Sequence, residues 1–318
     1  MSSRKTPTHG NDNVTIHATA HAMIGALTQM IEPVASVGSE SDKPPATLYH
    51  FTNLEGVRGI VSGRMLRGTS AKQLNDPSEI SYGLSVTEGY LRHRLTEDKS
   101  STETLTFLNR TLHYLTTEYI NHYIVSLCAS TNDSGRWLHY GSSGTGYALG
   151  FDSRHIETSN FGLVRVIYDE LEQRVVVSNA IKLMESKFVE LMHDRDSSID
   201  SDAMTEQAGS ICATAMRGLS ARLKHRSFSS EDEWRLVRIT VPISKTPVPT
   251  DYFARGSQIV HFVKAQYEES SFPLKEVVIG YSANVTQAKE SLGFIFKKEK
   301  LAVTPAITIS DVPVRPVI

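Results

Sequence analysis

The stretch TLYHFTNLEGVRGIVSGRML, from Thr47 to Leu66, decides how the main domain begins. TLYHF is short, apolar and rich in aromatic residues, as strands commonly are. Asn53 follows at a position where its side chain can cap a helix over LEGVRGIVS. Gly63 suits the position just past the end of that helix, where glycine is favoured. The sequence therefore predicts a strand that passes directly into a helix.

His50 and Thr52 are polar residues in this otherwise apolar strand. Because successive side chains of a strand point to opposite faces, His50 and Thr52 share one face, and Tyr49 and Phe51 share the other. Taken alone, such groups are most often satisfied by neighbouring backbone. The other interpretation is a strand that lines a cleft, with His50 and Thr52 in contact with a ligand.

The composition is that of a folded globular protein: 318 residues, 40% hydrophobic and 21% charged. Its 33 Lys and Arg residues nearly balance 35 Asp and Glu residues, so the net charge of -2 creates no overall field to attract nucleic acid. Cys128 and Cys212 lack metal-ligand spacing, which argues against a zinc site or a disulfide framework. With neither a secretory signal nor a membrane-length apolar run, we expect a cytoplasmic protein without a bound metal.

The chain is expected to have a short leading segment and one large domain. Residues 1–45 are predicted to be a polar tail with a candidate leading helix over VTIHATAHAMIGALTQMIEPV. Residues 46–318 are predicted to form a single domain with a helical insertion at about residues 177–224. Because strands and helices do not alternate regularly, we predict an α+β fold with a mixed, mainly antiparallel sheet.

The segment LNDPSE, Leu74 to Glu79, predicts the start of another helix. Asp76 can cap this helix, Pro77 suits its first position, and Glu79 stands where a capping box needs an acid. Cap chemistry therefore explains the segment without a function, although a helix N-terminus can also face an anion.

The segment SLCASTNDSGRWLHYGSSGTGYALGFD, Ser126 to Asp152, places aromatic residues beside a glycine-rich loop. Trp137 and Tyr140 offer flat surfaces on which a nicotinamide or adenine ring can stack. A hairpin whose aromatic side chains cover the core explains the pattern equally well.

The segment EDEWRLVRITVP, Glu231 to Pro242, brings acidic residues to the start of a strand. Alternation places Glu233 and Arg235 on the same face. A carboxylate there can stabilise a sugar cation, accept a proton, or form the commoner exposed ion pair with an arginine. The preceding basic run RLKHRSF, Arg222 to Phe228, is the local feature that would fit a nucleic-acid-processing hydrolase, although such runs usually mark a solvated helix end.

The chain resembles a bacterial domain family of unknown function in several motifs that occur in one order. The resemblance extends from about Leu48 to Gly280 and implies no activity by itself. The motifs are LYHFT with its following helix, NDPSE, SLCASTNDSGRWLHY, GYALGFD, EDEWRLV and KEVVIG.

The opening stretch LYHFTNLEGVRGIVSGRML also resembles the first motif of ADP-ribosyltransferases, particularly DNA-targeting ADP-ribosyltransferase toxins and RNA 2′-phosphotransferases. In these families a histidine in a strand binds the adenosine side or a ribose of NAD, and a glutamate on a later strand acts on the nicotinamide ribose. The resemblance implies a sheet core of that type and NAD as substrate. It assigns NAD binding to His50 and Thr52, and catalysis to Glu233.

The same resemblance implies further contacts with NAD. These families place a tyrosine or serine near the nicotinamide, and Ser126, Trp137 and Tyr140 are the open candidates here. Arg235 is included as a further NAD-binding candidate. A Glu233→Gln change is expected to lower the rate by orders of magnitude and to leave the fold intact.

We therefore expect an NAD-dependent ADP-ribosyltransferase, or an NAD glycohydrolase of the same fold. It would serve as a bacterial toxin, effector or antiphage defence component, and its acceptor would be a protein or a nucleic acid. The alternative is a non-catalytic nucleotide-sensing or protein-binding module of a defence system.

Overall fold

The computed structural model describes residues 43–74, 78–97, 100–117, 121–195, 200–239 and 250–313. The chain folds into two compact units. Among the described residues, one unit holds Thr87–Glu118 and Val175–Leu219, and the other holds the remainder. The sequence predicted a single domain from residue 46 onward. The expected tail and leading helix of residues 1–42 lie outside the described residues, as do Asp76 and Pro77 of the expected helix cap.

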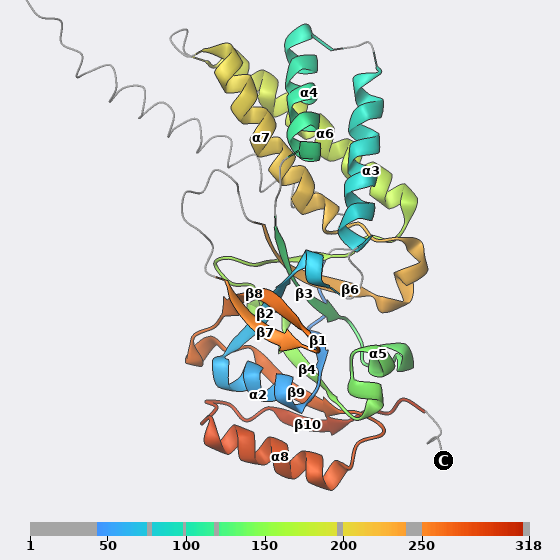
Figure 1. Ribbon diagram of the computed structural model, residues 1–318, viewed down its shortest axis with the longest axis vertical. Helices are drawn as coiled ribbons and strands as arrows, with labels where there is room; N and C mark the ends of the chain where they lie inside the picture. The colour runs from blue at the N-terminus through green and yellow to red at the C-terminus, as the bar shows by residue number, and fades with distance from the viewer. Residues whose placement is uncertain are drawn as a thin grey trace, which may run out of the picture. The chain divides into compact units, whose positions relative to one another are not determined.

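The larger unit is built on a sheet to which ten strands of the described residues belong. Its main path runs β10-β9-β4-β1-β3-β2-β8-β7, and β6 pairs with β3 and β5 off this path (Figure 1). All pairs are antiparallel except β9 with β10. This confirms the predicted mixed, mainly antiparallel sheet. The strands are β1 Thr47–Thr52, β2 Met65–Ser70, β3 His122–Cys128, β4 Tyr147–Asp152, β5 Gly162–Arg165, β6 Glu233–Ile239, β7 Asp251–Arg255, β8 Gln258–Gln266, β9 Leu274–Ile279 and β10 Ala306–Ile309.

Strand β1 passes into helix α2, Leu54–Gly63, as the sequence predicts. The Asn53 side chain accepts a hydrogen bond from the Gly56 N–H at 2.8 Å, which satisfies an unpaired amide of the first turn. The end of the helix differs from the prediction. Gly63 is still helical, and Arg64 takes the left-handed conformation with φ 47°. The Arg64 guanidinium donates to the carbonyls of Val61 and Glu299, which holds this residue in place.

Short elements and one long helix complete the larger unit. Helix α8, Val285–Lys298, is capped by Asn284, and its apolar face packs on the main core of the sheet. The sequence analysis assigned no strand to β2 or β7. In β2 the buried positions are Leu66, Gly68 and Ser70, so the strand lacks the apolar alternation that marks a half-buried strand. The short helices are α5 Ser134–His139, η2 Ala71–Gln73, η3 Ser142–Gly144, η4 Ser153–His155, η5 Arg226–Glu231 and η6 Glu269–Ser271.

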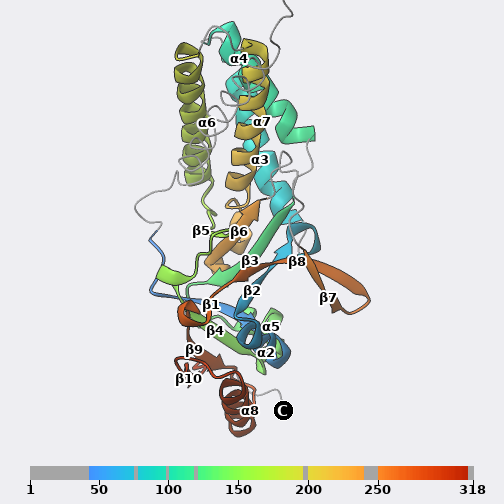
Figure 2. The ribbon, with the colours of Figure 1, turned by 90° about the vertical axis from the view of Figure 1, so that its left-hand side faces the viewer.

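The smaller unit is helical. Its helices are α4 Thr102–Thr117, the second half of α3 Ser78–Leu95, and most of α6 Glu170–His193 and α7 Ser201–Ser220. Phe107 of α4 stacks on Phe188 of α6 with ring centroids 4.2 Å apart, and the Arg217 guanidinium of α7 donates to the backbone of α4. Figure 2 shows the backbones of these helices. Helices α6 and α7 occupy most of the expected insertion. No described helix has the length and apolar character needed to cross a membrane.

A close approach of two loops fixes the ends of β4 and β9. The Gly280 N–H donates to the Gly146 carbonyl, and the Ser282 N–H donates to the Gly144 carbonyl, both at 2.9 Å. A Cβ atom on Gly280 would lie 2.2 Å from the Gly144 oxygen, which is backbone and cannot move aside as a flexible side chain can. A side chain at position 280 is therefore incompatible with this contact.

Two alanine substitutions should have opposite effects on stability. Gly280→Ala should lower the free energy of unfolding by about 1–3 kcal/mol, because the added methyl group overpacks the loop contact. Gly293→Ala in α8 should raise it by about 0.5–1 kcal/mol, because its Cβ meets no atom within 4 Å and alanine favours helix. Denaturant unfolding measures both values. A stable Gly280→Ala variant would contradict the described contact.

Candidate functional site

Strand β3 has a divided edge. Along one edge it pairs continuously with β6. Along the other, Ile124 pairs with Thr69 of β2 and Cys128 pairs with Tyr49 of β1. Ser126 lies between these two contacts and is the exposed position of β3. Because alternate residues of a strand direct their backbone groups to the same edge, the backbone of Ser126 faces the gap between β1 and β2.

A cavity of about 190 Å³ lies at this gap. It is smaller than the roughly 300–1,000 Å³ of typical small-molecule sites, so it suits part of a dinucleotide. Of the seven residues assigned from sequence, His50, Ser126, Tyr140 and Glu233 line it, and Thr52, Trp137 and Arg235 do not. Residues from β1, β3 and β6 that are distant in sequence are thus brought to one site.

His50 is fixed by the backbone at the gap. Its Nδ1 lies 3.0 Å from the Ser126 carbonyl oxygen. A carbonyl only accepts hydrogen bonds, so Nδ1 carries the proton, and in the neutral ring Nε2 is an acceptor. Burial lowers the pKa of His50 against a smaller opposing effect of the Ser126 contact, which favours the neutral ring. His50 can therefore accept a hydrogen bond from a ligand hydroxyl or amide.

Glu233 is buried between two cations. Its Oε1 accepts from Arg235 Nε at 2.9 Å, and its Oε2 accepts from Arg235 Nη2 at 2.9 Å and from Lys224 Nζ at 3.0 Å. Burial by itself raises the pKa of Glu233. Attraction and hydrogen bonding from Arg235 outweigh it, with smaller contributions from Lys224 and the Ser126 hydroxyl, and the pKa falls to about 2. The carboxylate is therefore ionised at neutral pH.

Lys224 connects this carboxylate to a second one. Its ammonium bonds both Glu231 and Glu233, lies 5.0 Å from the centroid of the Phe228 ring, and belongs to a side chain only 2% exposed. Arg222 is equally buried, and its Nε donates to the Arg165 carbonyl. The interpretation of RLKHRSF as a solvated helix end therefore holds only in part. Arg222 and Lys224 are buried with partners, whereas His225, Arg226 and Ser227 are exposed.

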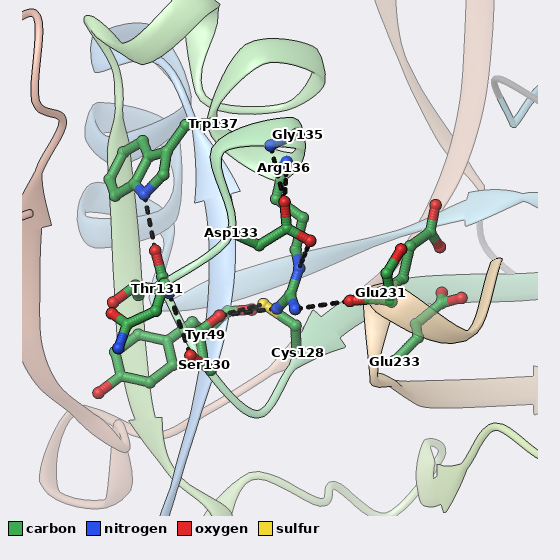
Figure 3. Close-up of polar contacts among 12 residues, drawn as sticks. Tyr49, Cys128, Ser130, Thr131, Asp133, Gly135, Arg136, Trp137, Glu231 and Glu233 are labelled. Atoms are coloured by element: carbon green, nitrogen blue, oxygen red, sulfur yellow. Dashed lines mark hydrogen bonds and ion pairs between the residues drawn. The ribbon is translucent and has the colours of Figure 1, made fainter. Parts of the chain in front are cut away.

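Trp137 is a core residue and offers no stacking surface to the cavity. It is fully buried, its indole N–H donates to the Thr131 carbonyl at 2.8 Å, and its ring meets Phe51 edge-on at 4.8 Å. Asp133 caps α5 by accepting from the N–H groups of Gly135 and Arg136, and this helix turns Trp137 inward. Figure 3 shows the indole directed away from Glu231 and Glu233. The sequence analysis read this helix as a loop.

Thr52 and Arg235 also have structural partners. Thr52 Oγ1 lies against helix α2, where a Cβ on Gly56 would come within 1.9 Å of it. Arg235 is fully buried and donates from Nη1 to the Ala221 carbonyl as well as to Glu233. Arg235 therefore acts on the cavity through Glu233, whereas Tyr140 is 42% exposed and lines the cavity directly.

Arg136 joins the loop after β3 to the segment before β6. Its guanidinium donates to Asp133 at 3.3 Å, to the Ser130 carbonyl at 2.7 Å and to the Ser230 carbonyl at 3.0 Å (Figure 3). The sequence analysis gave Arg136 no role. These bonds fix the position of Glu231, which follows Ser230 directly.

Cys128 lines the cavity as a neutral thiol. Burial raises its pKa to about 11, so it is a poor nucleophile at neutral pH. Within the described residues, no three His, Cys, Asp or Glu side chains are grouped as metal ligands.

These features define a mixed α/β protein with a cavity, lined by apolar and charged residues, in an open, mostly antiparallel sheet. Residues 136–236 match the model of a family described as "Protein of unknown function (DUF2971)". The matched segment includes α6, α7, Glu233 and the last four residues of α5, and it confirms the expectation of a domain family of unknown function. No curated protein and no solved structure matches the chain. The resemblance to ADP-ribosyltransferases stays a prediction.

The ion pairs of Glu233 predict a pH-dependent stability. Glu233→Gln should lower the free energy of unfolding at pH 7 by about 3 kcal/mol, because it leaves Arg235 buried without its counter-charge and removes one of the two acidic partners of Lys224. This replaces the expectation that the substitution leaves the fold intact. The folded pKa of about 2 lies below the unfolded value of about 4.3, so the contribution is complete above about pH 4.3 and is lost as the pH falls toward 2.

Denaturant unfolding of the wild type and of Glu233→Gln at pH 7, 5 and 3 measures the difference between their free energies of unfolding. It should be equal at pH 7 and 5 and smaller at pH 3. Glu55→Gln is the control, because Glu55 pairs with Arg58 in solvent and its loss should not measurably change stability. An equal difference at all three pH values would contradict the assigned ion pairs.

Proposed function

We propose that the protein binds NAD in this cavity, cleaves the bond between nicotinamide and ribose, and transfers ADP-ribose to a macromolecule or to water. The observation that carries the proposal is that His50 of β1 and Glu233 of β6 line one cavity. These are the two positions to which the resemblance to ADP-ribosyltransferases assigns NAD binding and catalysis. They are far apart in sequence, so their meeting was not dictated by local structure.

The state of Glu233 suits the chemistry. Breaking the nicotinamide–ribose bond builds positive charge on the ribose, as in glycoside hydrolysis. A carboxylate beside that charge stabilises the transition state more than the ground state. Glu233 is ionised at neutral pH because Arg235 and Lys224 lower its pKa. His50 would accept a hydrogen bond from the ligand through Nε2.

The partners of the reaction follow from the same resemblance. The acceptor of ADP-ribose would be a protein or a nucleic acid, and water would replace it in a glycohydrolase. A role as a bacterial toxin, effector or antiphage defence component belongs to this proposal.

A second candidate is a non-catalytic module that senses a nucleotide. It is favoured by the contacts of Glu233, since both carboxylate oxygens already accept hydrogen bonds from cations. If Glu233 is catalytic, Lys224 must leave Glu233 and move toward Glu231, its other partner, when the ligand enters. In the sensing reading, the ion pairs only hold the cavity in shape, and the nucleotide stays intact.

NAD labelled separately in its nicotinamide and adenosine parts distinguishes the two functions. Purified protein, with and without cell lysate, should release labelled nicotinamide and leave the adenosine label on protein, on nucleic acid or in free ADP-ribose. Glu233→Gln should lower nicotinamide release about 100-fold or more. Glu185→Gln is the matched control, because it removes a carboxylate from an ion pair with Arg94 in the helical unit, and it should keep full activity.

Thermal unfolding of both variants separates lost chemistry from lost fold. Binding of NAD that stays intact after long incubation would favour the sensing module. If the protein neither binds NAD nor releases nicotinamide in any lysate, both candidate functions are contradicted.

A further inference from the structure

The lining of the cavity carries more positive than negative charge. Among the described residues that line it, there are two carboxylates, Glu231 and Glu233, and four cationic side chains. Lys224 and Arg136 form ion pairs with acidic residues. Arg67 of β2 and Arg255 of β7 come from strands that were not predicted from the sequence. An anionic group of a ligand is the natural complement to this side of the cavity.

Arg67 is oriented by aromatic rings. Its guanidinium carbon lies 5.2 Å from the centroid of the Phe253 ring and 5.3 Å from that of Phe262. Within the described part of the chain, the Arg67 guanidinium has no hydrogen bond or ion pair. A cation–π contact fixes the plane of a guanidinium without using its N–H groups, so these donors stay available to a ligand.

The acids nearest to Arg67 are held by other cations. Asp251 of β7 pairs with Lys264 at 3.1 Å, and Glu55 of α2 pairs with Arg58 at 2.6 Å. Both act on Arg67 only through longer-range attraction. An incoming anion therefore does not have to displace a salt bridge from Arg67.

The position of Arg255 is fixed by Gln73 of η2, the short helix that follows β2. The Gln73 side chain donates to the Ile259 carbonyl at 2.7 Å and accepts from the His261 N–H at 2.8 Å. These bonds hold the β7–β8 hairpin against η2, and Arg255 of that hairpin donates to the Gln73 carbonyl. The hairpin and its arginine are thus fixed relative to β2, so Arg255 does not need to be ordered by the ligand.

We propose that Arg67 and Arg255 form a phosphate-binding subsite that holds the pyrophosphate of the dinucleotide. This inference rests on the proposed function, and it gives the ligand a direction in the cavity. The nicotinamide ribose lies toward Glu233, and the phosphates lie toward β2 and the β7–β8 hairpin. Planar guanidinium groups bind phosphate oxygens in pairs, which fits two arginines on one side of a small cavity.

Direct binding tests the subsite without requiring catalysis. ADP-ribose and inorganic pyrophosphate are titrated into the full chain by calorimetry, and wild-type protein should bind both competitively. Arg67→Gln and Arg255→Gln should each weaken ADP-ribose binding about 10- to 100-fold, the usual effect of losing hydrogen bonds to a charged group. Arg67→Lys keeps the charge and loses the planar fork, so it should lose less than Arg67→Gln.

Lys289→Gln is the matched control. Lys289 is an exposed residue of α8 and does not line the cavity, so its loss removes one positive charge from the protein and should leave the affinity unchanged. Thermal unfolding checks that Arg67→Gln keeps its fold after losing its ring contacts. The subsite is overturned if wild-type protein binds neither probe, or if folded Arg67→Gln and Arg255→Gln bind ADP-ribose as tightly as the wild type.

Nicotinamide release, measured on the same proteins, separates this inference from the proposed function. If the wild type releases no nicotinamide but binds ADP-ribose, and the arginine variants lose that binding, the result supports the subsite and contradicts the enzyme. Cleavage of NAD with unchanged affinity in both arginine variants supports the enzyme and overturns the subsite.

Discussion

The divided edge of β3 is the constraint on which the site depends. β3 is paired along the whole of one edge, but β1 and β2 share its other edge and meet it at opposite ends. A continuous partner strand would cover the backbone of Ser126 and close the cavity. The gap instead lets His50 bond the Ser126 carbonyl and brings Glu233, across β3, to the same space.

Burial of charge is the second determinant of the site. Taking a carboxylate out of water is costly unless cations and hydrogen bonds compensate, and Glu233 is compensated by Arg235 on its own strand and by Lys224 after α7. The same arrangement keeps the carboxylate ionised and limits its freedom. Its ionisation fits a role in stabilising a cation, whereas its full set of partners fits a structural role. Catalysis therefore depends on whether a ligand draws Lys224 away.

Local signals in the sequence predicted local structure well and tertiary partners poorly. The Asn53 cap, the strand before it and the antiparallel character of the sheet follow from side chains that act within a few residues of their own position. For Trp137 the sequence left a stacking surface and a core position equally open, because the cap at Asp133, which makes a short helix and turns the indole inward, was not recognised. The partners of Arg67 lie on β7 and β8 and could be found only once these strands were placed. Lys224 has partners within nine residues of its own position, but the turn of η5 that brings them together follows no pattern recognised in the sequence.

The structure of the protein in complex with ADP-ribose tests the central claim most directly. The account predicts that the ligand occupies the gap between β1, β2 and β3, with its terminal ribose beside Glu233 and His50 and its phosphates on Arg67 and Arg255. ADP-ribose bound elsewhere on the protein, with this cavity unoccupied and Lys224 still on Glu233, would contradict it.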